Sequence, residues 1–287
     1  MYASCEVTAK VADGTEVTFA EETDYPFTDT VTLTLKAPKR LAFPLVLRVP
    51  AWCDSPEIKV NGRPVDAPAG PAFTRVDRTW SDGDKVTLRF PQKTTVRTWE
   101  HNHASVSVDR GPLTYSLRID EEYQRIGGTE QFPEYAVHAT SPWNYGLVLD
   151  DREPAASLRH HAVRHVKDAN PFTLEGSPLT MTAQARRIPE WTADDEHVVM
   201  PLQDSPARST EPVEEVTLVP MGAARLRITS FPTAAPDAEP WLSDRWYRVR
   251  NRHSGKVLGV DTMSTADSAH VVQFDDNGTD DHLWQLV

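Results

Sequence analysis

Apolar and polar residues alternate along the first hundred residues of the chain. Between Glu6 and Leu35, valine and leucine positions alternate with threonine and charged residues. A period of two with many β-branched residues predicts half-buried antiparallel strands. Further short apolar segments follow at regular spacing, over residues 43–50, 57–60, 73–76, 85–90 and 105–108. About eight short strands in roughly 115 residues predict a β-sandwich over residues 1–116.

Turn signals separate these segments. Asn61-Gly62 follows an apolar strand directly, and both residues tolerate the positive φ of a type I′ turn, so this pair predicts a tight hairpin. The sequence Ser81-Asp82-Gly83-Asp84 predicts the turn between two further strands.

The rest of the chain changes character twice. Residues 117–232 contain clusters of proline and charge and predict a second strand-rich domain, closed by a hairpin of residues 215–220 and 225–229. Residues 233–241 have two prolines and no apolar periodicity, which is typical of a semi-rigid linker. Residues 242–287 then form a distinct module.

Composition and charge exclude several classes of protein. The 287 residues include 23 prolines against 13 glycines, which disfavours long helices. The formal charge of −12 opposes binding to nucleic acid. The longest apolar run, Leu41–Leu47, is far below the roughly 20 residues of a membrane span, and the first 20 residues lack the pattern of a signal peptide. We therefore expect a soluble chain with neither a nucleic-acid nor a membrane partner.

The first 232 residues resemble the C-terminal, all-β portion of glycoside hydrolase family 127, the β-L-arabinofuranosidase family. Six segments in the same order carry this resemblance: 22–27, 47–52, 60–62, 78–84, 108–113 and 218–223. The resemblance implies an N-terminal (α/α)₆ barrel that performs catalysis with a zinc-bound cysteine nucleophile and a glutamate acid/base. We expect this barrel to be a missing partner, because no helical stretch here could build it.

No catalytic residue, metal ligand or cofactor site of that family can be placed on this sequence. Its two cysteines, Cys5 and Cys53, lie in sandwich-type sequence, where they could form one disulfide or remain thiols. A pair of carboxylates for glycoside hydrolysis must face each other across a cleft, and nothing in the sequence singles out such a pair.

The final 42 residues resemble one repeat of a ricin B-type lectin, the β-trefoil module. The resemblance runs through residues 246–249, 251–258, 264–267, 272–274, 276–278 and 282–284. His282 occupies the position of glutamine in the family's Gln-x-Trp signature. A trefoil needs three repeats around a shared core, so a single repeat cannot bury its apolar face alone. Either the coding sequence is truncated at both ends, or the repeat docks on the preceding sandwich or on other copies of itself.

Lectin sites combine an aromatic ring, which stacks on a sugar, with polar side chains that bind vicinal hydroxyls. In this module the ring would be Phe274 and the polar partner Asn277. Gly259 replaces the acid that usually follows Leu258, which leaves Asp261 as a substitute. Asp261, Phe274, Asn277 and His282 are therefore the candidate carbohydrate-binding residues. The alternative is a purely structural repeat with Trp246, Phe274 and Trp284 in its core and Asn277-Gly278 as a turn.

Other candidate groups favour plain structural roles. The acidic segment 275–281 lacks the spacing of a calcium loop and predicts a solvated turn. His161 and His165 could share a helix face, but no further ligand completes a zinc site. His101 and His103, on a strand, could line a groove against the barrel. Trp52 and Trp80 are expected in the sandwich core.

The sequence thus predicts an all-β chain: two antiparallel β-sandwich domains plus a partial β-trefoil repeat. The favoured function is that of a non-catalytic C-terminal part of a glycoside hydrolase, which supports the barrel and binds a plant-type or bacterial glycan, with arabinose-containing glycans among the candidates. The alternatives are a free-standing glycan-binding protein whose repeat oligomerises, and a glycosidase with a site in the sandwich. The lectin-like tail suggests that the intact protein is extracellular.

Overall fold

A computed structural model describes residues 2–162, 169–194, 198–235 and 246–285. The chain divides into two units, residues 1–236 and residues 237–287. The described residues contain strands and four short 3₁₀ turns but no α-helix, so the prediction of an all-β fold is confirmed. No helix in the described part of the chain has the length and apolar character to span a membrane.

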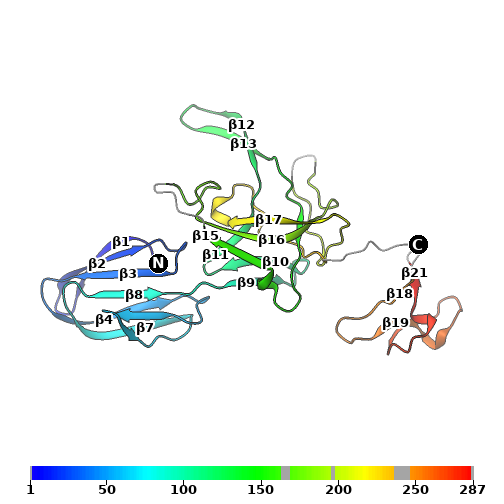
Figure 1. The fold of residues 1–287 in the computed structure, drawn as a ribbon, viewed down its shortest axis with the longest axis horizontal. Coiled ribbons are helices and arrows are strands. Elements are labelled where there is room, and N and C mark those ends of the chain that lie inside the picture. Colours follow the sequence, from blue (N-terminus) through cyan, green and yellow to red (C-terminus); the bar gives the residue numbers. More distant parts are fainter. Residues whose placement is uncertain (1, 163–168, 195–197, 236–245, 286–287) are drawn as a thin grey trace. The chain divides into compact units, whose positions relative to one another are not determined.

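The first hydrophobic core lies between a six-stranded antiparallel sheet and a two-stranded ribbon (Figure 1). In spatial order the sheet contains β1 (Cys5–Val11), β2 (Thr15–Thr23), β3 (Thr30–Lys36), β8 (Lys85–Arg89), β5 (Glu57–Val60) and β6 (Arg63–Val65). The ribbon pairs β4 (Leu41–Val49) with β7 (Ala72–Trp80). Alternate residues of both layers are buried, as the period of two in the sequence predicts.

Two predicted turns are joined by one carboxylate. Asn61 and Gly62 adopt φ of 51° and 79° between β5 and β6, which confirms the predicted hairpin. Asp84, in the second turn, accepts hydrogen bonds from Asn61 Nδ2 (2.7 Å) and from the Ser81 backbone N–H (2.9 Å). Burial alone would raise the pKa of Asp84, but these hydrogen bonds and the charges of Arg78 and Arg40 outweigh burial and lower it. Asp84 thus stays ionised and fixes the two turns to each other.

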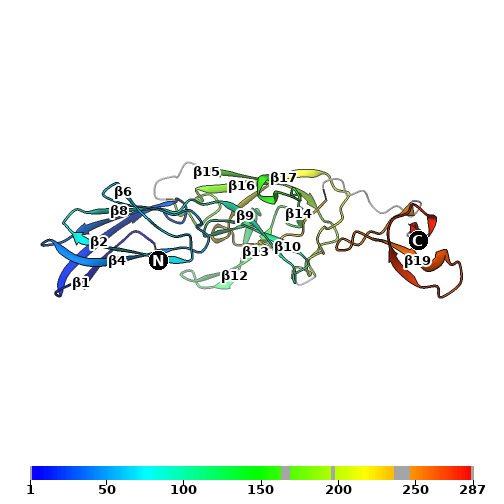
Figure 2. The same cartoon turned by 90° about the horizontal axis from the view of Figure 1, so that it is seen from below.

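The second core lies on one face of a seven-stranded antiparallel sheet. Six strands follow the order β14 (Tyr145–Leu147), β16 (Leu179–Arg187), β17 (Val213–Pro220), β11 (Leu113–Leu117), β10 (Ser105–Arg110) and β9 (Thr94–Trp99). The seventh strand, β15 (Leu158–Ala162), runs beside β16 (Figure 2). The segment 105–108, which continued the first series of strands in the sequence, therefore pairs within the second sheet.

A hairpin of β12 (Glu121–Gly128) and β13 (Pro133–Ala139) extends from this sheet (Figure 1). Its base is held by Glu121, whose Oε1 accepts the backbone N–H groups of Arg225 (3.0 Å) and Leu226 (2.9 Å). Tyr123, Phe132 and Tyr135 are exposed along the hairpin. Most of its apolar surface is therefore open.

The structure corrects the prediction of a closing hairpin. Residues 215–220 lie in β17, but residues 225–229 form no strand. Both edges of β17 are already paired, with β16 and β11, so no edge is left for another strand. Ile228 instead accepts a hydrogen bond from the Leu117 backbone N–H at 2.9 Å, beside β11.

The structure describes only the first part of the predicted linker, residues 233–235. Residues 236–241 lie outside the described residues. Thr233 and Ala234 form bridges with Leu147 and Ala207, and Ala234 is buried, so these two residues pack into the first unit. No other finding tests the predicted domain limits, which stay a prediction.

The predicted histidine geometries are not observed. His101 and His103 lie in the turn between β9 and β10, not on a strand, and His103 Nδ1 lies 2.6 Å from Asp204 Oδ1. His160 and His161 lie on β15 instead of a helix, and His165 is outside the described residues.

Trp80 is the largest side chain in the first core and is fully buried, as predicted. Its indole stacks on Phe43 with ring centroids 5.8 Å apart, and Nε1–H donates to the Phe43 carbonyl at 2.9 Å. We expect Trp80→Ala to lower the free energy of unfolding by about 3 to 5 kcal/mol, because the cavity would lie in a closed core.

Urea unfolding followed by circular dichroism measures this loss. Phe73→Ala is the matched control, since Phe73 is 70% exposed on the same ribbon, and it should change stability by less than about 0.5 kcal/mol. Equal losses in the two variants would contradict the assignment of Trp80 to the core.

Candidate lectin-like site

The second unit consists of two short strand pairs. β18 (Trp246–Tyr247) pairs with β21 (Trp284–Gln285), and β19 (Val257–Val260) pairs with β20 (Val271–Phe274). Trp284 ties the pairs together, because its Nε1–H donates to the Leu258 carbonyl at 3.0 Å. Val257 is the one large apolar side chain that is fully buried among the described residues of this unit. A repeat of this size therefore forms only a minimal core.

Several large apolar side chains of the unit face outward. Trp246, Val249, Val271 and Phe274 are all exposed, while Trp284 is half-buried. The described residues of this unit therefore leave Trp246 and Phe274 uncovered, and the alternative of a purely structural repeat stays a prediction. Phe274, 57% exposed, presents its ring to the outside, as a sugar-stacking residue must.

The four candidate residues meet at one pocket of about 120 Å³, which Asp261, Phe274, Asn277 and His282 line together with Gly259 and Asp281. Asp261 and His282, 21 positions apart in sequence, line one pocket because the turn Asp280–His282 packs against β19, which is paired with β20. The structure therefore gathers the candidate residues at one pocket, and their roles stay a prediction.

Asp261 and Asn277 supply the polar rim. Asp261 is exposed directly after β19, and its backbone N–H donates to the His270 carbonyl at 2.9 Å. Asn277 Oδ1 accepts from the Thr279 backbone N–H (3.2 Å) and from Thr279 Oγ1 (2.6 Å), which fixes the amide and leaves Nδ2 to donate. Asn277 thus serves the predicted turn and also borders the pocket. A carboxylate acceptor and an amide donor on one rim match a pair of sugar hydroxyls.

His282 forms the floor of the pocket. It is 1% exposed, with Nε2 at 3.5 Å from Asp281 Oδ2 and Nδ1 at 4.0 Å from Asp276 Oδ1. Nδ1 has no hydrogen-bond partner, although it is buried. A buried nitrogen without a hydrogen-bond partner is costly.

The position of the His282 side chain depends on the absence of a side chain at Gly259. A Cβ atom on residue 259 would lie 2.5 Å from His282 Cδ2 and 3.2 Å from Asp281 Oδ2. The imidazole can therefore occupy its position only if residue 259 is glycine. The two departures of this repeat from the lectin pattern, glycine for the acid and histidine for glutamine, are thus sterically linked.

The acidic segment 275–281 is held by cations of the protein. Asp276 pairs with Arg250 Nη2 at 2.9 Å and with Arg248 Nη1 at 3.5 Å. Within the described part of the chain, no three histidine, cysteine, aspartate or glutamate side chains are placed to share a metal ion.

The described residues also do not fit a zinc-bound cysteine nucleophile. Cys5 is exposed and Cys53 is buried, and both are free thiols. Burial raises the pKa of the Cys53 thiol, which disfavours the reactive thiolate. No catalytic step can be built on either cysteine.

Comparison with known families identifies what the two units are similar to. Residues 1–92 match the family "Beta-L-arabinofuranosidase, GH127 middle domain", and residues 237–287 match "Ricin-type beta-trefoil lectin domain-like". These matches confirm the resemblance to GH127 over residues 1–92 and the resemblance to a ricin B-type lectin over residues 237–287.

Solved structures agree with the fold of the first unit. The structure of Ara127N-Se, a GH127 β-L-arabinofuranosidase from Geobacillus stearothermophilus T6, is similar over 81% of this chain with 24% identity and a TM-score of 0.54. The GH127 β-arabinofuranosidase BT3674 is similar over 81% of this chain with 19% identity and a TM-score of 0.54. The matched regions cover 33% and 34% of those chains, so this chain spans about a third of their length. No curated protein sequence matches the chain.

The contact between Gly259 and His282 can be tested by substitution. We expect Gly259→Ala to destabilise the second unit by about 1 to 3 kcal/mol, because the new methyl group overlaps the imidazole. Hydrogen exchange of the amides in β19 and β20 measures the change.

The double variant Gly259→Ala/His282→Ala separates this contact from a general backbone effect. If the imidazole causes the strain, Gly259→Ala lowers the stability of the second unit less in the His282→Ala background than in the wild-type chain. Equal losses of stability in the two backgrounds would show that the methyl group of residue 259 is not strained against His282.

Proposed function

We propose that this chain is a non-catalytic part of a β-L-arabinofuranosidase-like glycoside hydrolase and that its lectin-like unit binds carbohydrate. The observation that carries the binding role is the position of Phe274, whose exposed ring borders the same pocket as Asp261 and Asn277. The ring would stack on the C–H face of a sugar, while the carboxylate and the amide would bind vicinal hydroxyls.

The first unit has a supporting role in this proposal. Its six-stranded sheet and ribbon form the GH127 middle domain, and the matched solved structures contain about twice as much additional chain. The catalytic barrel of the intact enzyme would be the partner of this unit. The lectin-like unit would hold the enzyme on a plant-type or bacterial glycan, such as one that contains arabinose, and the intact protein would then act outside the cell.

Binding is tested by affinity electrophoresis of the purified chain in gels that contain arabinan, galactan or xylan. We expect at least one glycan to retard the chain. Phe274→Ala should weaken that retardation about three- to tenfold, because an aromatic contact contributes about 0.5 to 1.5 kcal/mol beyond its buried area.

Phe73→Ala is the matched control, since it removes an exposed phenylalanine of the first unit. It should migrate like the wild-type chain at every glycan concentration. Unchanged retardation of Phe274→Ala, or retardation by none of the three glycans, would argue against a binding role for this pocket.

The proposal also predicts the absence of activity in the chain alone. Incubation with a chromogenic β-L-arabinofuranoside should release no chromophore above the buffer rate, because no described residue fits the nucleophile of the family. Turnover that copurifies with the chain through gel filtration would contradict the non-catalytic role and would favour a glycosidase site in the sandwich.

A further inference from the structure

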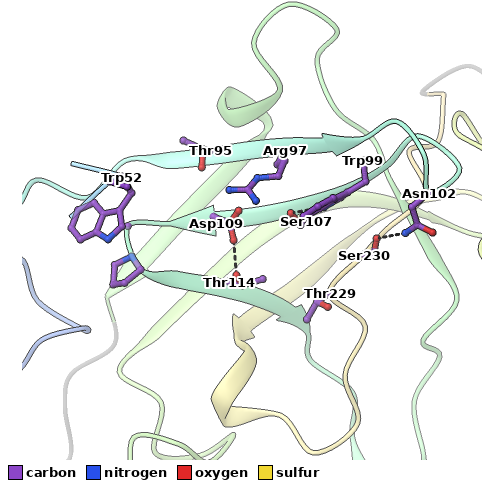
Figure 3. A pocket seen from close by; sticks show the side chains of 13 residues that line it. Trp52, Thr95, Arg97, Trp99, Asn102, Ser107, Asp109, Thr114, Thr229 and Ser230 are labelled. Atoms are coloured by element: carbon purple, nitrogen blue, oxygen red, sulfur yellow. Dashed lines mark hydrogen bonds between the residues drawn. The ribbon is translucent and has the colours of Figure 1, made fainter. Parts of the chain in front are cut away.

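A hollow of about 750 Å³ lies in the first unit, and none of the residues that the sequence pattern singled out as sugar ligands lines it. It covers the face of β9, β10 and β11 that points away from the second core (Figure 3). Its volume lies within the roughly 300 to 1,000 Å³ that is usual for small-molecule sites. We propose that this hollow, the sheet-face groove, binds a neutral oligosaccharide.

Aromatic rings mark both ends of the groove. Trp52 lies at one end and Trp99 at the other, with Arg97 and Asp109 between them (Figure 3). Trp99 is 44% exposed, although it is among the largest apolar side chains, and Trp52 is half-buried against the first core. Two rings separated by polar groups match a chain of sugar units, in which apolar C–H faces recur at intervals.

The groove is preorganised. Trp99 Nε1–H donates to Ser107 Oγ at 3.1 Å, and the Arg97 guanidinium lies 5.2 Å from the Trp99 ring centroid. Thr114 Oγ1 donates to Asp109 Oδ1 at 2.6 Å. These contacts hold the indole and the carboxylate in place before a ligand arrives, which lowers the entropic cost of binding.

The charges of the groove favour an uncharged sugar. Arg97 and Asp109 are its only charged lining residues among those described, so their formal charges cancel. A guanidinium donates to hydroxyl oxygens and a carboxylate accepts from hydroxyl protons, so vicinal hydroxyls can use both groups. A uronate would gain from Arg97 but would be repelled by Asp109.

The lining also argues against a protein surface as the occupant. The centre of a stable protein interface is depleted of charged residues. Here the centre of the groove contains Arg97 and Asp109, surrounded by the hydroxyl groups of Thr95, Ser107 and Thr114. Such a surface suits a ligand that consists largely of hydroxyl groups.

The test uses the full chain labelled with 5-fluorotryptophan, in the Phe274→Ala background that disables the lectin-like pocket. Short linear arabino-, xylo- and galacto-oligosaccharides are titrated while the ¹⁹F resonances of the tryptophans are recorded. Trp99→Phe identifies the resonance of Trp99. We expect at least one neutral oligosaccharide to shift this resonance in a saturable way and to leave that of Trp80, buried in the first core, unchanged.

Substitutions within the groove should weaken the same binding. Trp99→Ala and Asp109→Asn should each lower the affinity about three- to tenfold, through the lost ring and the lost carboxylate. Phe73→Ala, on the exposed face of the ribbon, should leave it unchanged, and far-UV circular dichroism verifies that each variant is folded.

Three outcomes would overturn the proposal: no saturable shift of Trp99 with any neutral oligosaccharide, a shift with oligogalacturonate alone, or equal affinities of Trp99→Ala and Phe73→Ala. Because Phe274 is already replaced, failure here leaves the proposed role of the lectin-like unit intact. Conversely, if Phe274→Ala abolishes retardation in the glycan gels, this result does not contradict oligosaccharide binding in the sheet-face groove.

Discussion

The backbone ladder that joins β9, β10 and β11 is the constraint on which the sheet-face groove depends. Ser107 pairs with Arg97, and Asp109 pairs with Thr114. Successive side chains of a strand point to opposite faces, so this register sends Val108 into the second core and Asp109 into the groove. A shift by one residue would reverse every side chain, so the core that buries the valines also fixes the polar face.

Aromatic rings are exposed in the two units for different reasons. In the first unit, a large core leaves one face of a sheet free to hold Trp99 among polar groups. In the second unit the core is minimal, and Phe274 is exposed because a single repeat has too few residues to cover it. Under our proposals, one chain carries two separate sugar-binding surfaces, and a polymeric glycan that engages both would be held more tightly than by either alone.

Local patterns predicted local structure well. The strands around Leu33 and Val76, and the turn at Asn61-Gly62, follow from alternation and from residues that tolerate positive φ. Residues 225–229 had the same alternation, yet both edges of β17 were occupied by partners from elsewhere in the chain. The alternation of apolar and polar residues in a segment shows which face the segment can bury. It does not show whether a neighbouring strand has a free edge with which the segment can pair.

For this protein the sequence alone determined the all-β class, the tight turns and the two family resemblances. These features depend on short segments, in which neighbouring residues set backbone conformation. Tertiary structure alone decided that Trp99 stays exposed and that Gly259 must accommodate His282. Exposure and close packing depend on which distant segments share a sheet or a core, and long-range pairing is not encoded in any single segment.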